Sequence, residues 1–518
     1  MTKNVSEIYP VTLTFLPDDF IWPESVETGL LDGGEPLPVK SAPFINDLAA
    51  VEQAKYRIGL DHDELIGEVE RLTVNPVLEL IKVNWSGLPD LLGGSMVEPK
   101  QQEGIVLVYR KQGEEGLRIE QATGHDLLAL KIVAEKRDRR AVAAEGETSV
   151  SQIDAILYEA KRKGLIFSPS SRITRISEVR REEQVDEPYN RAEVFTLQWH
   201  LTQKCDLHCK HCYDRSTREE MSLEQALSVL DRLYEFCEQN HVRGQVSFTG
   251  GNPILYPHFQ EVYRQAVTRG FLTAILGNPV SGKCLDEIVS MQRPEYFQVS
   301  LEGLAAHNDY IRGEGHFDRV MAFLDRLEEV GVYRMVMLTL TRDNMGDVFR
   351  LTESLRDKVD LFNFNRLASV GEGAALKTVP FKEYQSFLVE YRQKAADNPI
   401  MGCKDNLFNI LQERDNAPLT GGCTGFGCGA AFNFVSLLPD GEVHACRKFP
   451  SFIGNLFDKS LSAIYEGVQA GKYRTGSASC EGCRIRHCCG GCPAVNYGLG
   501  NDIFTTVDPY CFIGQPDN

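Results

Sequence analysis

The sequence has little that would suit a membrane, secreted or nucleic-acid-binding protein. No apolar run in its 518 residues is long enough to span a bilayer, and the opening MTKNVSEIYP lacks the apolar core of a signal peptide. Lys and Arg number 55 against 73 Asp and Glu, a formal net charge of -18, which argues against binding through nucleic-acid phosphates. We therefore expect a cytoplasmic protein with no membrane and no nucleic-acid partner.

Cysteine is absent before Cys205 and concentrated toward the other end of the chain. Ten of the 15 cysteines lie between Cys403 and Cys511. A secreted disulfide framework usually belongs to a small chain with a signal sequence. Clustered cysteines in a chain of this size therefore indicate metal binding.

Strand and helix patterns alternate between residues 194 and 396. Six βα units of this kind predict a parallel sheet covered by helices, with function at the carboxyl ends of the strands. Helical stretches such as 222–239 and 316–330 separate the strands, which are expected at 194–201, 245–250, 272–278, 296–303, 334–341 and 361–368.

The regions on either side of these units have a different character. The cysteine-free N-terminal part predicts strands at 104–111 and 117–122, helices at 124–136 and 150–164, and a short closing strand, LIFSPS. From about residue 400 the chain is rich in Gly and Cys, and metal ligation is expected to substitute there for a large apolar core.

The segment CDLHCKHCY directly follows the first strand of the series. Its thiolates, Cys205, Cys209 and Cys212, can hold an iron–sulfur cluster and leave one iron of four open to a ligand. The alternative is a structural zinc loop whose fourth ligand is another residue, such as His208 or His211. Spacing alone leaves both interpretations open.

This arrangement resembles the radical S-adenosylmethionine (SAM) superfamily. The resemblance implies that the open iron binds the amino and carboxylate groups of SAM. One electron would then release methionine and a 5′-deoxyadenosyl radical, which abstracts hydrogen from a substrate. It also implies that His211, at a position usually aromatic in the family, lies near the adenine.

Further motifs follow where the resemblance requires them. TGGNP, after the second strand, resembles the family's Gly-Gly-Glu-Pro motif for the SAM amino group, which implies contacts from Gly250, Gly251 and Asn252. Asn252 replaces the family's Glu, and its amide oxygen accepts a hydrogen bond without supplying charge. Taken alone, the glycines could simply form a tight turn.

The fourth strand and the segment after it supply two more candidates. By the same resemblance, Ser300 and Arg312 lie near the ribose and carboxylate of SAM, and a guanidinium suits a carboxylate. Each could otherwise be an ordinary surface residue. Asn344 and Arg366, after the fifth and sixth strands, are additional candidates for cofactor or substrate contact.

Two cysteine groups near the C-terminus provide enough ligands for two more clusters, although CxxC spacing alone also fits zinc. They resemble the SPASM extension of radical SAM enzymes. The resemblance implies one auxiliary cluster on Cys423, Cys428, Cys446 and Cys492, and another on Cys480, Cys483, Cys489 and Cys511. Cys488 is the alternative to Cys489, and Cys403 is an alternative ligand near the first group. Cys237 and Cys284 are expected to be small buried residues.

These observations predict an α/β fold: a partial (β/α)6 radical SAM barrel, a Cys-rich SPASM domain and an α+β N-terminal region. We expect a mainly helical part of unknown role at 1–95 and a winged-helix-like module at 96–175. The barrel is expected at 190–400 and the SPASM domain at 401–518. The 104–170 pattern resembles a RiPP recognition element, which binds leader peptides, although an accessory domain for oligomerisation is equally compatible.

The main hypothesis is a radical SAM oxidoreductase that modifies a ribosomally made precursor peptide (RiPP maturation). Its layout resembles the thio(seleno)oxazole or selenobiotic-peptide maturases. The expected cofactors are three 4Fe–4S clusters and SAM, and the expected partners are a precursor peptide with a leader and an electron donor such as flavodoxin or ferredoxin. The sequence identifies no catalytic base.

Three alternatives stay open. One is modification of a small molecule or tetrapyrrole, and another is a non-catalytic iron–sulfur electron carrier or redox sensor. The third is sulfatase-type protein maturation. Sulfatase-maturing enzymes carry a catalytic Asp after the cysteine that matches Cys446, whereas this chain has Arg447 there.

Overall fold

The structure is a computed structural model that describes residues 2–17, 42–60, 68–95, 97–114, 116–175, 187–425 and 427–514. The chain divides into two units, Met1–Ser170 and Ser171–Asn518, and each is described by itself. In the described ranges we find no helix with the length and apolar character needed to cross a bilayer.

The first unit combines a three-stranded antiparallel sheet, in the order β2-β3-β4, with a small β1-β5 pair, six α-helices and one short 3-10 helix (Thr12–Phe15) among its described residues. The strands are β1 (Thr73–Val74), β2 (Leu78–Ser86), β3 (Lys100–Tyr109), β4 (Arg118–Gln121) and β5 (Ile166–Phe167). The helices are α1 (Thr2–Ile8), α2 (Ile45–Leu60), α3 (Leu88–Leu92), α4 (Gly124–Ala134), α5 (Arg139–Glu145) and α6 (Val150–Lys163).

Strand β3 has an apolar core on each of its two faces. Val106 and Val108 belong to a core that includes α2, whereas Leu107 and Tyr109 belong to a core with α4, α5 and α6. Successive side chains of a strand point to opposite faces, which explains the unbroken apolar run. The domain boundary expected near residue 95 thus falls between β2 and β3, two paired strands of one sheet.

In the second unit, six parallel strands follow one another in chain order across the sheet, and the predicted partial barrel is confirmed. Each lies where the sequence predicted it. They are β6 (Val194–Thr202), β7 (Arg243–Gly250), β8 (Leu272–Leu276), β9 (Phe297–Ser300), β10 (Arg334–Leu340) and β11 (Leu361–Arg366).

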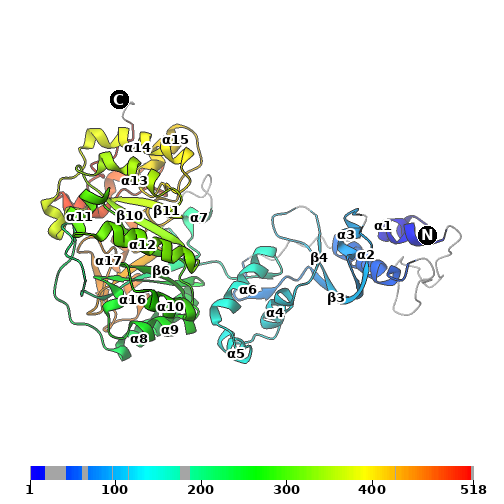
Figure 1. Cartoon of the computed structure of the whole chain (residues 1–518). Helices are drawn as coiled ribbons and strands as arrows, with labels where there is room; N and C mark the ends of the chain where they lie inside the picture. The colour runs from blue at the N-terminus through cyan, green and yellow to red at the C-terminus, as the bar shows by residue number, and fades with distance from the viewer. Residues whose placement is uncertain are drawn as a thin grey trace. The chain divides into compact units, whose positions relative to one another are not determined.

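Helices separate these strands and pack against the sheet, as Figure 1 shows. Helix α8 (Leu223–Asn240) begins with a capping box, in which Ser222 and Gln225 each bond the other's backbone N–H, and it ends at His241 in a left-handed conformation. The other helices of this part are α7 (Glu187–Asn190), α9 (Phe259–Thr268), α10 (Gly282–Met291), α11 (Ala305–Arg312), α12 (His316–Glu329), α13 (Val348–Ser354) and α14 (Phe381–Asp397).

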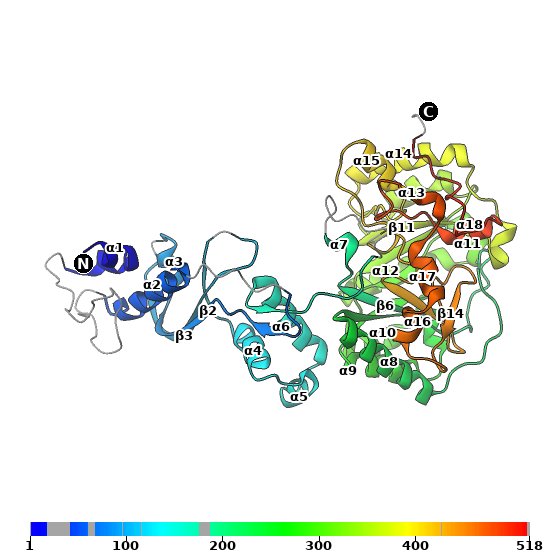
Figure 2. The same cartoon turned by 180° about the vertical axis from the view of Figure 1, so that it is seen from behind.

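The C-terminal segment continues the same sheet. Strand β12 (Phe434–Leu437) pairs in parallel with β6, and β13 (Glu442–His444) and β14 (Phe452–Asn455) extend it in antiparallel. Helices α16 (Leu461–Tyr465) and α17 (Val468–Thr475) pack beside β14, as Figure 2 shows from behind. The remaining helices are α15 (Phe408–Arg414) and α18 (Pro493–Gly498).

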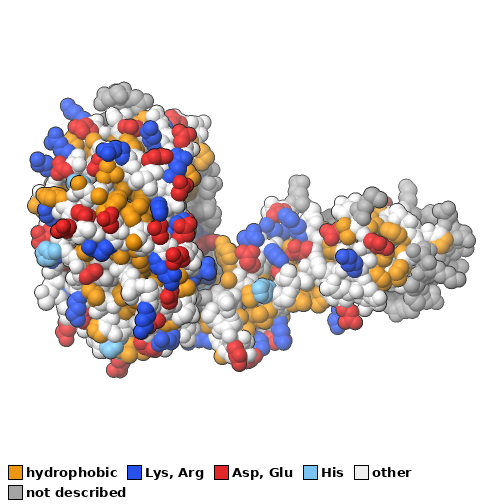
Figure 3. All heavy atoms as spheres, viewed as in Figure 1, with side chains coloured by type: hydrophobic (Ala, Val, Ile, Leu, Met, Phe, Trp, Pro, Cys, Tyr) orange, Lys and Arg blue, Asp and Glu red, His pale blue; other side chains and the backbone are white. Residues whose placement is uncertain are grey.

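The surface of the second unit mixes charges of both signs. In Figure 3 its visible face carries interspersed basic and acidic side chains. No extended basic field, which would attract nucleic acid, covers that face.

Candidate functional site

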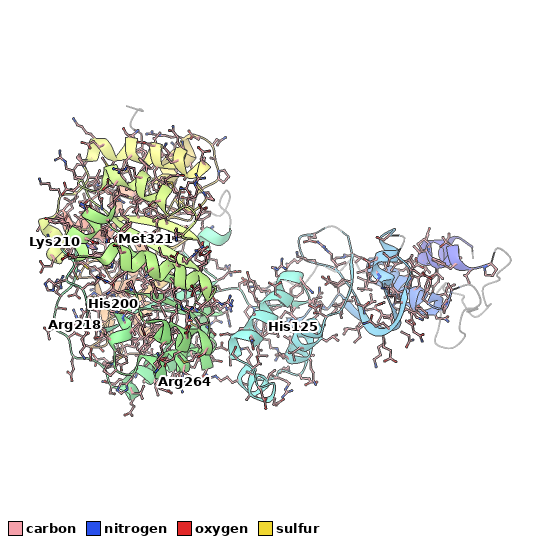
Figure 4. All side chains as sticks on the ribbon, viewed as in Figure 1. His125, His200, Lys210, Arg218, Arg264 and Met321 are labelled. Atoms are coloured by element: carbon pink, nitrogen blue, oxygen red, sulfur yellow. The ribbon has the colours of Figure 1, made fainter. Side chains whose placement is uncertain are left out.

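The three cysteines of the first group lie on the loop that follows β6. All three line a cavity of about 460 Å³ at the carboxyl ends of the barrel strands. Backbone bonds fix the start of this loop, because Thr202 O accepts from Gly251 N at 2.8 Å and Lys204 O accepts from Asn252 N at 2.7 Å. Lys210, in the same loop, and Arg218 lie toward one side of the unit (Figure 4).

Glycines allow neighbouring segments to pack closely on this loop. A Cβ atom at Gly250 would collide with Thr202 O, and one at Gly251 would collide with Lys204 O. Gly371, with φ 59°, approaches the loop from another segment, and a Cβ there would lie 2.7 Å from Cys212 O. The donor set of three thiols in a fixed loop beside a ligand-sized cavity fits an iron–sulfur cluster with an open position.

Arg312 is held at the cavity wall by a buried carboxylate. Its Nη2 lies 2.6 Å from Glu302 Oε1, and its Nη1 lies 3.8 Å from Cys209 Sγ. Glu302 is 2% exposed, and its other oxygen accepts from Thr339 N at 2.8 Å. The guanidinium is therefore positioned before any ligand binds.

His211 lies beside the Arg312–Glu302 ion pair. Its Nε2 lies 3.3 Å from Glu302 Oε1 and 3.4 Å from Arg312 Nη2. Burial lowers the pKa of His211 to about 4, despite the opposing effect of the Glu302 carboxylate. Burial would raise the pKa of Glu302, but His211 and Arg312 hold it below its usual value. At neutral pH, His211 is thus a neutral imidazole, Glu302 a carboxylate and Arg312 a guanidinium.

Five of the six residues expected to contact SAM line this cavity: His211, Gly250, Gly251, Ser300 and Arg312. Asn252 is not among the described residues of the cavity wall. It is 4% exposed, and its amide donates to Asp206 Oδ1 at 3.0 Å, which also accepts from Asn278 at 2.6 Å. Whether any of these residues contacts SAM stays a prediction.

The two additional candidates are tied to protein groups. Asn344 uses its amide to bond the backbone of Thr339, Thr341 and Glu302, so it fixes the turn after β10. Arg366 lines the cavity, and its guanidinium is paired with Asp405 and Asp508, both at 2.8 Å.

Within the described residues, no three side chains of His, Cys, Asp or Glu are arranged around a position for a single metal ion.

The four cysteines expected in the first auxiliary group are neighbours in the fold, and their ligation of one cluster stays a prediction. Burial raises the pKa of Cys428 to about 12, and the neighbouring thiols of Cys423, Cys492 and Cys446 contribute. Although Cys423 and Cys492 are distant in sequence, they are electrostatic neighbours in the fold. Four thiols in one place suit a fully ligated cluster.

In the second group the adjacent cysteines have different surroundings. Burial and the thiols of Cys483 and Cys511 raise the pKa of Cys480. The buried Cys489 has Cys511 among its neighbours, whereas Cys488 has Arg175 and Cys483. The Cys488 thiol donates to Ile485 O at 3.4 Å. Each of the two adjacent cysteines thus neighbours one other cysteine of this group, Cys489 with Cys511 and Cys488 with Cys483, and Cys489 as the fourth ligand stays a prediction.

The other cysteines lie apart from these groups or at their margin. Cys237 is 4% exposed in α8, as expected for a small apolar residue, and Cys284 in α10 is half-buried. Cys403 lines a second cavity together with Cys423, which keeps it available as an alternative ligand.

Cations beside the first auxiliary group were not expected as site residues. Arg447 and Lys448 line the first cavity, and Arg447 donates to Thr249 Oγ1 at 3.0 Å. Burial lowers the pKa of Lys404 to about 8, with Lys448 and Arg447 adding to the effect and the Cys423 thiol opposing it. The three cations are therefore neighbours. Only Arg447 carried a signal in the sequence, through its place after Cys446.

Comparison with known proteins identifies both domains. The radical SAM superfamily matches residues 199–353, and the SPASM iron–sulfur cluster-binding domain matches residues 428–490. The predicted radical SAM and SPASM domains are thereby confirmed, and these domains imply 4Fe–4S clusters and SAM as cofactors.

Among curated proteins, the chain is similar to the AdoMet-dependent heme synthase of Oleidesulfovibrio alaskensis, with 24% identity over 61% of this chain and 86% of that protein. It is also similar to AlbA, the antilisterial bacteriocin subtilosin biosynthesis protein of Bacillus subtilis, with 25% identity over 56% and 65%. Among solved structures, Streptococcus suis SuiB bound to precursor peptide SuiA has a TM-score of 0.51 at 16% identity, over 79% of this chain and 96% of SuiB.

Proposed function

We propose that this radical SAM and SPASM enzyme oxidatively modifies residues of a ribosomally made precursor peptide. The observation that carries the proposal is the first unit, in which a sheet with open edges stands beside a helical layer. In the described sheet, β4 pairs only with β3. An edge strand offers unpaired backbone groups that an extended peptide can bond.

The helical layer of the first unit adds a rigid support for such a peptide. Helices α4 and α6 each begin with a capping box, and α6 ends at Gly164 in a left-handed conformation. Lys163 also pairs with the buried Asp126 at 2.8 Å, which fixes the end of α6 against the start of α4. A leader peptide would bind this unit while the residues to be modified enter the barrel.

The similarities support a peptide substrate. SuiB is described with its precursor peptide, and its match covers 79% of this chain. This share is larger than the second unit, Ser171–Asn518, so the match extends into the first unit. AlbA is named for the biosynthesis of a bacteriocin. The extent of the SuiB match fits a first unit that has a part in peptide binding.

Each part of the site has a role in this reaction. When bound, SAM and the first cluster supply one-electron hydrogen abstraction. Cys205, Cys209 and Cys212 would hold that cluster, while Arg312, set by Glu302, orients the carboxylate of SAM. The neutral His211 would lie beside the adenine. The two groups of SPASM cysteines would hold the auxiliary clusters, which accept an electron or bind the peptide.

Turnover with a candidate precursor tests the proposal. Anaerobically reconstituted enzyme, SAM and a reductant are incubated with short peptides encoded beside the gene, and the products are analysed by mass spectrometry. We expect a SAM-dependent loss of hydrogen mass from one peptide. Formation of 5′-deoxyadenosine with every peptide unchanged would contradict the proposal.

The role of the first unit is tested by deleting residues 1–170. The second unit has its own apolar core, built only from residues beyond 170. The deletion is expected to weaken peptide binding but to spare uncoupled cleavage of SAM. If peptide affinity is unchanged by the deletion, the first unit does not bind the leader and is an accessory domain.

Modification of a tetrapyrrole is the second candidate, because the heme synthase similarity covers 61% of this chain, against 56% for AlbA. An iron porphyrin with carboxylate side chains, incubated under the same conditions, tests it. A SAM-dependent change in the porphyrin, with all peptides unchanged, would favour this candidate.

A further inference from the structure

Two cavities of the second unit meet at the residue that follows Cys446. The second cavity has a volume of about 410 Å³ and is lined by strand residues of the barrel interior together with Cys423 and Lys404. Arg447 lines both cavities. It therefore lies at their junction, between the first cysteine loop and the first auxiliary group.

Most cations of the first cavity have a carboxylate partner. Arg312 is paired with Glu302, Arg366 with Asp405 and Asp508, and Arg215 lies 3.9 Å from Glu372. The positive charges of these three arginines are therefore compensated by carboxylates of the protein itself.

Arg447, Lys448 and Lys404 differ from those arginines. The bond that Arg447 makes goes to a neutral hydroxyl, that of Thr249. Within the part of the chain that the structure describes, Lys448 and Lys404 form no side-chain hydrogen bond or ion pair, and no carboxylate lines the second cavity. Asp214, the acid of the first cavity, already accepts from Ser216 N and Gln203 Nε2, both at 2.8 Å.

Lys404 lies beside the thiols of Cys423 and Cys446 but, like Lys448, lacks a carboxylate partner among the described residues. A half-buried cation without an anionic partner is costly, and a bound anion reduces that cost. We propose that Arg447, Lys448 and Lys404 form an anionic subsite that holds a carboxylate of the substrate next to the first auxiliary group. A guanidinium and two ammonium groups match the charge and hydrogen-bonding of a carboxylate.

The subsite extends the proposed function, on which it rests for the source of the carboxylate. In a precursor peptide this group is the side chain of Asp or Glu, or the C-terminus, close to the residue that is modified. A propionate of a tetrapyrrole has the same chemistry. The carboxylate would fix the substrate along the axis between the SAM pocket and the auxiliary cysteines.

A display library of random peptides tests the subsite without a known substrate. The library is selected on reconstituted, SAM-loaded full-length enzyme and on the double variant Arg447→Gln/Lys448→Gln. We expect Asp and Glu to be enriched on the unaltered enzyme and not on the double variant. An acidic peptide from the selection should lose at least about tenfold in affinity on the double variant. Its amide counterpart, with Asn or Gln, should bind both enzymes equally.

Two controls separate the subsite from other roles of the same cations. Lys283→Gln, on a side chain 89% exposed in α10, should leave the enrichment unchanged. The affinity for SAM, the iron content and the cluster reduction potentials are measured on every variant. If the double variant loses SAM affinity instead of acidic preference, or only shifts a cluster potential, these cations serve a cofactor and the subsite is refuted.

Coproporphyrin III and its tetramethyl ester identify the source of the carboxylate. If the free acid binds more tightly than the ester through Arg447 and Lys448, and no peptide is selected, the subsite stands and the peptide function fails. If peptides are selected with no acidic preference, the peptide function stands and the subsite fails.

Discussion

Arg366 and Asp508 form a buried, two-pronged ion pair, with Nη1 to Oδ1 and Nη2 to Oδ2 both at 2.8 Å. The arginine ends β11 of the barrel, and the aspartate lies close to Cys511 in sequence. Asp508 Oδ2 also accepts from Cys492 N at 2.8 Å. One carboxylate thus connects the barrel with Cys492 of the first auxiliary group, and the main-chain carbonyl of the same residue accepts from Cys511 N at 2.8 Å.

Asp508→Asn should destabilise the second unit and its auxiliary sites. It removes one of the two carboxylates, with that of Asp405, that compensate a buried arginine, and breaking a buried pair costs up to about 3–5 kcal/mol. Urea unfolding and iron content of the reconstituted protein measure the effect. Asp286→Asn is the matched control, because its pair with Arg326 is exposed and should contribute at most about 1 kcal/mol. Equal effects of the two variants would show that the buried pair has no special role.

Gly251→Ala should damage the first cysteine loop. A Cβ at this position collides with the backbone of Lys204, which cannot move aside as a flexible side chain would. We expect loss of iron from the first site and loss of 5′-deoxyadenosine, measured by chromatography. Gly346→Ala, with nothing within 4 Å of the added Cβ, should retain both. Normal SAM cleavage by Gly251→Ala would mean that the loop tolerates displacement.

Cys489→Ala and Cys488→Ala should behave differently. The first is expected to lose iron equal to one cluster, because Cys489 lies with Cys511, while the second keeps all of it. Iron analysis and Mössbauer spectroscopy of the reconstituted variants measure this. The reverse result would assign the ligand to Cys488.

Arg312→Lys should weaken SAM binding by about tenfold, because an ammonium keeps the charge but loses the two-pronged geometry that suits a carboxylate. Equilibrium binding of SAM to the reconstituted enzyme tests this. Arg319→Lys, an exposed change on α12, serves as the control. If Arg312→Lys binds SAM normally, Arg312 pairs with Glu302 for structural reasons alone.

The barrel was predictable from the sequence because its information is local. Buried parallel strands have nearly continuous apolar sequences. The run RMVMLTLT at 334–341 therefore predicts β10 to within one residue. Helix α8 has a complete set of start and stop signals. The short α5, RRAVAAE, carries too few apolar positions to be recognised and was missed.

Features that depend on distant contacts were not predictable. The pairing of β12 with β6 joins segments far apart in the chain, which no local pattern indicates. The boundary expected near residue 95 divided a sheet because the sequence does not show that β3 is covered on both faces.

The residues of the candidate site also fall into two classes, those that the sequence predicted and those that only the fold brings together. Cysteine spacing and the order of motifs after successive strands identified the residues around the first cavity. The bond from Asn252 to Asp206, the approach of Gly371 and the convergence of Lys404 on Arg447 arise only when loops from different strands meet.

The pairing of β12 with β6 also bears on how this enzyme could be divided or engineered. An unpaired strand edge is a template for association with other chains. Removing residues 401–518 would expose the edge of β6 along the first strand of the barrel, in addition to losing the auxiliary cysteines. The SPASM segment thus covers an edge of the catalytic sheet that would otherwise be unpaired. A barrel expressed without it should aggregate, even when its own iron–sulfur cluster is intact.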